Sequence, residues 1–301
     1  MARKERIDAF GGAFLVGFSA LLGLNQVLVK LVNAGFAPAF QAGLRSALAF
    51  LPVLIFALLM RKRLSLSDGS FRPGVICGLL FSVEFVLLFM ALDFTTVSRA
   101  SIFFYTMPVW VTLGAHFLIP GEGMTKAKAL GLVFAVSGVA LALSGNATPA
   151  TEWALVGDLM CLLAALCWAA IALMARTTAF SKSIPEMQLL YQLAVSAPAM
   201  IAFAVLTGDT IREPTEAHLA ILLFQSFVVV GMGFLTWFWV LSVYPASDMA
   251  SFGFLAPVFG VIFGWLVFDD ALTLQLVAAL ALVGLGIVLV NRKSKRGPTR
   301  S

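Results

Sequence analysis

Two charged residues, Glu84 and Arg45, lie inside long apolar runs of the sequence. Glu84 belongs to the run 73–92 and Arg45 to the run 37–60. Each lies about eight residues from one end of its run, which is roughly 12 Å at the rise of an α-helix. An ionisable group in an apolar helix is costly, so it is a functional hypothesis by default. Two interpretations remain open: a buried ion pair that braces two helices, or two charges facing a cavity, where Glu84 would bind an ammonium group or a proton.

Further polar and aromatic side chains lie inside similar apolar runs. The candidates for lining a central cavity are Asn25, Gln26, Arg45, Ser82, Glu84, Ser101, Tyr105, Trp168, Tyr191, Gln225, Trp237 and Ser251. An apolar, aromatic pocket with a few convergent polar groups suits a small molecule that carries a sizeable side chain. A structural alternative stays open for each candidate, because a hydroxyl can bond within its own helix and a Trp can simply pack.

The known catalytic and cofactor motifs are missing from the sequence. It contains no H-E-x-x-H, no Gly-x-Ser-x-Gly and no phosphate-binding loop. Cys77, Cys161 and Cys167 lie inside apolar runs without metal-ligand spacing, which favours packing roles. We therefore predict no enzymatic activity, no metal site and no cofactor.

The composition indicates that lipid surrounds most of the chain. Of the 301 residues, 61% are hydrophobic and only 12% are charged, whereas soluble domains carry about 25% charged residues. The apolar runs are about 20 residues long and do not alternate, so they predict an all-α integral membrane protein and exclude barrel strands. Ten transmembrane helices are expected, at 10–32, 37–60, 73–92, 97–118, 127–144, 154–175, 184–206, 217–241, 247–268 and 271–290. The first run is too long for the core of a signal peptide and is expected to remain as a span.

The positions of Lys and Arg predict the orientation of these spans. Basic clusters at 3–6 and 292–300 flank the first and last spans, and the loops at 61–63, 126–128 and 176–182 are also basic. Because basic loops stay in the cytoplasm, both termini are expected there. The net charge of +5 therefore reflects the orientation of the spans in the membrane, and no nucleic-acid partner is expected.

A repeat relates the two halves of the chain. The stretch SRASIFFYTMPVW, residues 98–110, aligns with SDMASFGFLAPVF, residues 247–259, and places Pro108 opposite Pro257. Weaker matches run through the rest of both halves. We expect one five-helix repeat in residues 1–145 and a second, with a basic tail, in residues 146–301.

An odd number of spans in each repeat inverts the second copy relative to the first. Further matched positions pair Glu122 with Asp270 and Lys30 with Arg176. Inverted repeats are typical of transporters whose substrate site lies at the interface of the halves. Proline removes a backbone donor, so we predict helix kinks at Pro108 and Pro257 that free backbone groups beside a cavity.

These motifs carry a family resemblance. The duplicated five-span pattern, the Pro-Val in spans 4 and 9, the acid-x-x-Thr before spans 5 and 10, and Arg45 after Pro38 resemble the drug/metabolite transporter superfamily, EamA type. The resemblance covers residues 8–291 and is greatest to bacterial exporters of aromatic amino acids. It implies ten helices around a central cavity lined by spans 1, 3, 4, 6, 8 and 9. Arg45 aligns with Gln192 and Glu84 with Gly233, so the site itself is not expected to be symmetric.

The sequence and this resemblance together predict a secondary transporter in the bacterial inner membrane. It would export amino acids, including aromatic ones, and related small metabolites from the cytoplasm by alternating access. The alternatives are an exporter of other metabolites or drugs, such as nucleosides or sugar phosphates, and an intramembrane enzyme. The expected partners are a small-molecule substrate and membrane lipid, and the chain is expected to act as a monomer. Both proton coupling and facilitated diffusion remain open as driving forces.

Overall fold

The computed structural model describes residues 7–144, 152–244, 249 and 252–291. Eight helical segments in these ranges are long and apolar enough to cross a membrane, so the chain is a multi-pass membrane protein. They are α1 (Ala9–Asn33), α2 (Pro38–Leu59), α3 (Phe71–Phe94), α4 with α5 (Val97–Phe104 and Met107–Leu118), α6 (Lys126–Leu143), α7 (Ala154–Thr177), α8 (Pro185–Thr207) and α13 (Leu274–Asn291).

The remaining described helices are shorter or combine several kinds of helix. The 3-10 helix η1 (Ala179–Lys182) precedes α8, and α12 (Leu255–Phe268) precedes α13. Between α8 and α12, α9 (Glu216–Phe224), the π-helix η2 (Gln225–Met232) and α10 (Gly233–Val243) follow one another without interruption. The helices cover the expected apolar runs with ends shifted by a few residues, and the run 247–268 is described as a helix only from Leu255.

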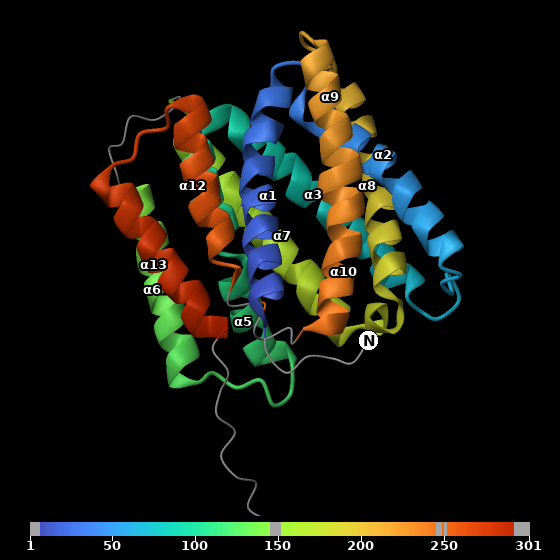
Figure 1. Ribbon diagram of the computed structural model, residues 1–301, viewed down its shortest axis with the longest axis horizontal. Coiled ribbons are helices and arrows are strands. Elements are labelled where there is room, and N and C mark those ends of the chain that lie inside the picture. The colour runs from blue at the N-terminus through green and yellow to red at the C-terminus, as the bar shows by residue number, and fades with distance from the viewer. Residues whose placement is uncertain (1–6, 145–151, 245–248, 250–251, 292–301) are drawn as a thin grey trace, which may run out of the picture.

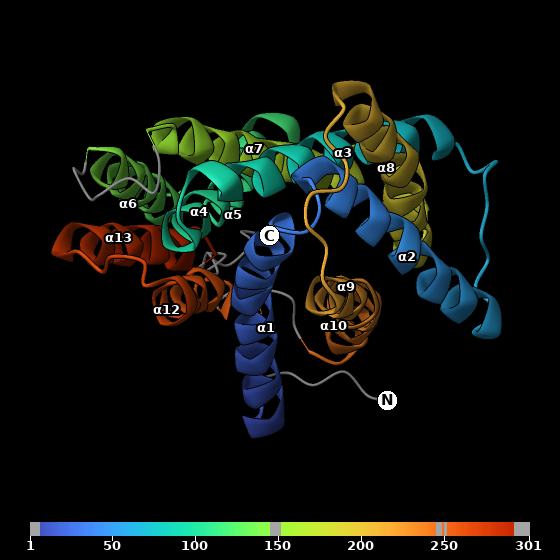
Figure 2. The same cartoon turned by 90° about the horizontal axis from the view of Figure 1, so that it is seen from above.

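The helices pack in pairs that join distant parts of the chain. Seen from above, α6 lies beside α13 at one end of the molecule and α2 lies beside α8 at the other (Figure 2). Helices α3 and α7 pack along one long side, and α1 packs against α12 (Figures 1 and 2). Each of these pairs takes one helix from residues 9–143 and one from residues 154–291.

The two duplicated prolines lie at helix starts. Helix α4 ends at Phe104 and α5 begins at Met107, so Pro108 is the second residue of a helix. Pro257 is the third residue of α12. Proline is well tolerated in a first turn, because the N–H that it lacks would have no partner within the helix. The span 97–118 is interrupted at Tyr105 and Thr106, shortly before Pro108. The kinks beside a cavity that the sequence predicts at Pro108 and Pro257 stay a prediction.

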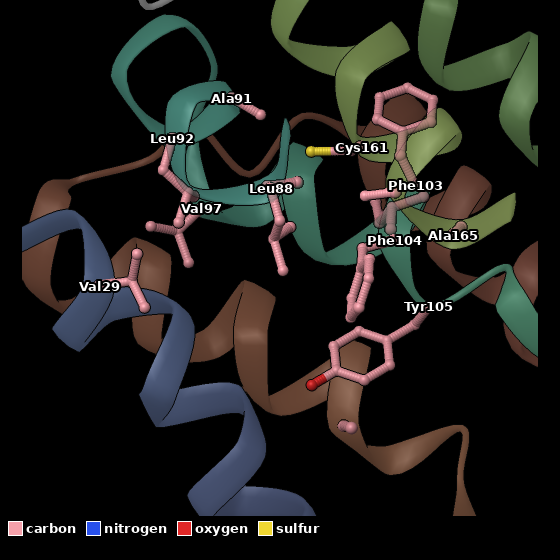
Figure 3. Close-up of a cluster of buried hydrophobic side chains, with 14 of the residues drawn as sticks. Val29, Leu88, Ala91, Leu92, Val97, Phe103, Phe104, Tyr105, Cys161 and Ala165 are labelled. Carbon is pink, nitrogen blue, oxygen red and sulfur yellow. The ribbon is translucent and has the colours of Figure 1, made fainter. Parts of the chain in front are cut away.

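The largest hydrophobic core surrounds this break. Phe103 and Phe104 at the end of α4 pack with Leu88 of α3 and with Cys161 and neighbouring residues of α7 (Figure 3). Side chains from α1, α2, α6, α8, α12 and α13 complete the cluster. The core therefore joins helices from both halves of the chain around the short helix α4.

Glycines allow α6 and α13 to approach closely. A Cβ atom at Gly286 would lie 2.7 Å from the Gly131 carbonyl oxygen, and one at Gly131 would lie 2.9 Å from the Gly286 oxygen. Small residues at such crossings are a general device of membrane helices, where van der Waals packing replaces the hydrophobic effect. A larger side chain at either position must push the two backbones apart.

The substitution Gly286→Leu is therefore expected to destabilise the protein. Overpacking of a tight contact costs about 1–3 kcal/mol. The matched control is Gly284→Leu on the same helix, because a Cβ atom at Gly284 would meet nothing within 4 Å. Thermal unfolding in detergent should show a lower midpoint for Gly286→Leu only. Equal midpoints for the two variants would show that the α6–α13 contact accommodates a larger side chain without loss of stability.

A buried polar cluster as the candidate functional site

A chain of amide groups crosses the interior of the helix bundle. The Gln225 amide of η2 donates to the Asn25 side-chain oxygen of α1 over 3.3 Å. The Gln41 amide of α2 donates in turn to the Gln225 oxygen over 3.4 Å. The chain links three helices through side chains alone, at the point where α9 gives way to the π-helix η2. Single π-helical turns inside α-helices are frequent at functional sites.

Arg45 lies one helical turn beyond Gln41 on α2. Its side chain is buried, with 2% of its surface exposed. The guanidinium carbon lies 4.2 Å from the ring centre of Phe85 and 4.6 Å from that of Phe89, both on α3. Within the described part of the chain Arg45 donates no hydrogen bond, and its Nε atom is buried without a partner. Cation–π contact thus stabilises the charge while all its donors stay free.

Glu84 precedes Phe85 on α3 and is fully buried, with 0% of its surface exposed. Both of its carboxylate oxygens lack a hydrogen-bond partner among the described residues. Glu84 and Arg45 interact electrostatically, but they form no direct ion pair. The interpretation as a bracing ion pair is therefore wrong. We refer to Asn25, Gln41, Arg45, Glu84 and Gln225 as the interior polar cluster.

Gln26 and two of the predicted serines lie in different settings. Gln26 is buried on α1, and its side-chain oxygen has no partner in the described part of the chain. The Ser82 hydroxyl donates to the Gly78 carbonyl of its own helix over 2.8 Å. The hydroxyl of Ser101 is buried where α4 crosses α12 and would lie 2.1 Å from a Cβ atom at Gly260. Ser101 thus contacts α12 at a helix crossing, and its hydroxyl has no hydrogen-bond partner among the described residues.

The predicted aromatic residues are dispersed over the bundle. Tyr105 packs edge-on against Phe104 with ring centres 5.5 Å apart (Figure 3). Trp168 keeps 37% of its surface exposed, and Trp237 stacks on Phe18 of α1 with ring centres 5.1 Å apart. Tyr191 accepts a hydrogen bond from Ser70 near the ends of α3 and α8. None of them joins the interior polar cluster through a hydrogen bond that the structure describes, and Ser251 lies outside the described residues.

Sequence reasoning missed two buried polar features. Gln41 is not among the predicted residues, although an amide inside an apolar helix is itself a signal. Arg99 and Asp158 form a buried ion pair between α4 and α7, and Thr95 also donates to Asp158 over 2.7 Å. Asp158 lies close to the start of its apolar run, so its burial depends on the neighbouring helices.

A strap of loop contacts closes one end of the bundle next to the cluster. Phe36 and Ile211 form an antiparallel bridge, flanked by hydrogen bonds from Ala37 N–H to the Thr210 oxygen and from Arg212 N–H to the Gly35 oxygen. We call residues 34–37 together with residues 209–213 the upper strap, because it lies at the top of Figure 1.

Arg212 anchors the upper strap to two helices. Its guanidinium donates to the Asn33 carbonyl and to Asp93, each over 2.9 Å, and to Asp209 of its own loop over 3.3 Å. A pocket of about 250 Å³ lies beside this network, lined by residues of α2, α3, α8 and the strap. No residue of the interior polar cluster lines this pocket, so it is a separate feature.

A second strap joins the loops at the opposite ends of α2, α3, α7 and α8. Ser183 donates to Ser70 over 2.7 Å and to Asp68 over 3.2 Å, and Lys62 pairs with Glu186 over 2.8 Å. Hydrogen bonding by Ser70, with a smaller contribution from Ser183, holds the pKa of Asp68 below its usual range. We call these residues the lower strap.

A family profile and several named relatives match the chain. The profile described as the EamA-like transporter family matches residues 9–144 and again residues 155–292. The uncharacterized transporter YoaV of Bacillus subtilis is 26% identical over 277 residues, which cover 91% of this chain and 94% of YoaV.

Two further comparisons concern an efflux pump and a solved fold. A probable amino-acid metabolite efflux pump of Escherichia coli is 28% identical over 300 residues, covering 94% of this chain and 93% of the pump. One solved crystal structure superposes with a TM-score of 0.65 at 19% identity and covers 92% of this chain and 94% of its own. That likeness concerns the fold alone. The names of the relatives indicate a transporter rather than an enzyme.

Proposed function

The chain belongs to the EamA-like transporter family, and we propose that it exports amino acids and related small metabolites from the bacterial cytoplasm. It is a secondary carrier that acts as a monomer in the inner membrane, with both termini cytoplasmic. Its ten spans form two inverted repeats, and the upper strap lies on the external side. Large aromatic amino acids are among the substrates.

The observation that carries this proposal is the interior polar cluster. Buried polar groups in native proteins almost always have partners, so each unpartnered one calls for an explanation. Among the residues that the structure describes, the charged groups of Arg45 and Glu84 form no hydrogen bond inside an apolar bundle. A polar molecule that visits the cluster supplies the missing partners. The name of the relative in Escherichia coli supports an amino acid as that molecule.

The pairing of charged residues supports an inverted repeat. Arg176 of α7 forms an ion pair with Glu122, which lies between α5 and α6. At the positions equivalent to these two, Lys30 of α1 is attracted to Asp270, which lies between α12 and α13. In both cases one repeat contacts the hairpin of the other, at opposite ends of the bundle. Such exchange is what two interlocked, oppositely oriented repeats produce.

The two straps extend the same symmetry to the loops. The upper strap joins the first loop of repeat one to the second loop of repeat two, and the lower strap joins the first loop of repeat two to the second loop of repeat one. Alternating access then amounts to opening one strap while the other stays closed. The π-helix that begins at Gln225 offers a segment whose backbone pairing can rearrange.

Efflux from proteoliposomes tests the proposal. Vesicles that contain the purified protein are loaded with a panel of labelled amino acids, nucleosides and sugar phosphates, and release is measured with and without a pH gradient. We expect protein-dependent release of amino acids, above that of protein-free vesicles. Release of nucleosides or sugar phosphates alone would overturn the assignment of substrate. A rate that follows the pH gradient would identify proton coupling, and an unchanged rate would identify facilitated diffusion.

A further inference from the structure

The free hydrogen-bonding groups of the interior polar cluster have opposite charges on two facing helices. Within the described ranges, Arg45 of α2 donates no hydrogen bond and its Nε atom is buried without a partner, and Glu84 of α3 has two acceptor oxygens without a partner. The Gln41 side-chain oxygen, one turn from Arg45, is also an unpartnered acceptor. The cluster therefore has unused capacity to bind an anionic group and a cationic group at the same time.

We infer that this site selects zwitterions: Arg45 binds the α-carboxylate of the substrate and Glu84 binds its α-ammonium group. This inference rests on the proposed function and names the chemical class that the site accepts. The Gln41 oxygen supplies a further acceptor for the ammonium group. The rings of Phe85 and Phe89, already in contact with Arg45, hold the guanidinium in place for the carboxylate.

Charge balance is the physical basis of the selection. Arg45 and Glu84 together carry no net charge, so the interior of the bundle tolerates them as a set. A zwitterion also has no net charge, and each of its charged groups meets one of opposite sign. A simple amine would leave the Arg45 charge next to a second cation, and a simple carboxylate would leave Glu84 next to a second anion. Both leave an uncompensated charge in an apolar interior, which is strongly unfavourable.

The absence of a direct ion pair between Arg45 and Glu84 agrees with a role in binding a zwitterion. If Arg45 and Glu84 bonded directly, a substrate would first have to break that bond. As they stand, the two charges interact electrostatically, while Arg45 Nε and both Glu84 oxygens have no hydrogen-bond partner among the described residues. Ionised donors and acceptors form the strongest hydrogen bonds, and guanidinium matches a carboxylate in a bidentate arrangement. Binding of the substrate therefore places its carboxylate next to Arg45 and its ammonium group next to Glu84, so that each charge has a neighbour of opposite sign.

The test compares three ligands that share one side chain. L-Phenylalanine carries both charged groups, L-phenylalaninamide lacks the carboxylate, and 3-phenylpropionate lacks the ammonium group. Each competes with labelled phenylalanine for binding to the purified wild-type protein. We expect the two single-charge ligands to bind at least about tenfold more weakly, which corresponds to about 1.4 kcal/mol. Equal affinity of either analogue for the wild-type protein would overturn the inference without any variant.

Two variants assign the two charges. In Arg45→Gln the preference for phenylalanine over its amide should vanish, while the preference over phenylpropionate remains. In Glu84→Gln the pattern should reverse. The matched controls are Arg176→Gln and Glu122→Gln, which make the same chemical changes in a partly exposed ion pair and should leave both preferences intact.

The outcomes separate this inference from the proposed function. Wild-type protein that binds and exports no amino acid refutes the proposed function itself. Wild-type protein that exports phenylalanine, with cluster variants that keep both preferences or lose both together, refutes only the assignment of Arg45 and Glu84. Where a single variant does not fold, the double variant Arg45→Gln/Glu84→Gln restores neutrality. It is then expected to bind all three ligands without preference.

Discussion

A disulfide between Phe36→Cys and Ile211→Cys is expected to stop export, and its reduction is expected to restore it. The two residues form the antiparallel bridge of the upper strap. The hydrogen bonds that flank the bridge leave Phe36 and Ile211 as a non-hydrogen-bonded pair, whose Cα atoms lie about 4.5 Å apart in such ladders. This separation is within the range that a disulfide spans without backbone movement. Locking the strap prevents the two repeats from parting on that side.

The measurement is efflux from proteoliposomes before and after oxidation, with a reductant added at the end. We expect oxidation to lower the rate at least about tenfold in the double variant and not in either single variant. Cys167, which is only partly buried, is replaced by Ala in every sample so that it cannot react. Full export by the cross-linked protein would show that the upper strap stays closed throughout transport, and alternating access would then need another exit.

Glu84→Leu is expected to be the most destabilising single change in the interior polar cluster. It leaves the buried Arg45 charge without its compensating carboxylate, and an arginine cannot lose its proton. Breaking a direct buried ion pair costs about 3–5 kcal/mol. Arg45 and Glu84 interact without direct contact, so the cost here is expected to be at most of that size. Arg45→Leu should cost less, since a carboxylate left alone can bind a proton and become neutral.

The double variant Arg45→Leu/Glu84→Leu provides the control. Replacing both buried charges with apolar residues is often neutral for stability, so the double variant should unfold near the wild-type midpoint. Thermal unfolding of the four proteins in detergent gives the coupling between the two sites. A double variant whose losses equal the sum of the single ones would mean that the two charges do not compensate each other. Export should be lost in all three variants, whatever their stability.

Hydropathy and charge along the chain were sufficient to predict the membrane class and the helical runs. These properties depend on neighbouring residues and on the solvent, and a run such as 73–92 must be helical in lipid because its backbone groups have no other partners. The same local argument identified Glu84 and Arg45, since an ionised side chain in an apolar run is conspicuous without any knowledge of its neighbours. The repeat was also visible in the sequence, through Pro108 and Pro257.

The direction in which each side chain points was decided only by the tertiary structure. In the sequence, Ser101 and Tyr191 lie in apolar runs just as Asn25 and Gln225 do. Close approach of α4 and α12 places Ser101 against Gly260, and Ser70 of the lower strap donates a hydrogen bond to Tyr191. The rotation of a helix about its axis depends on the helices that it meets, and those partners lie far away in the sequence.

The packing of helices also explains why Arg45 and Glu84 form no direct ion pair. Their depths in two neighbouring helices allowed an ion pair, and depth follows from counting residues. Whether the charged atoms meet depends instead on Phe85 and Phe89, whose rings occupy the contact with the guanidinium. The sequence by itself determined that two opposite charges lie inside the membrane at similar depth. The packing of α2 against α3 decided that their hydrogen-bonding atoms stay free, because aromatic rings stabilise a cation without using its donors.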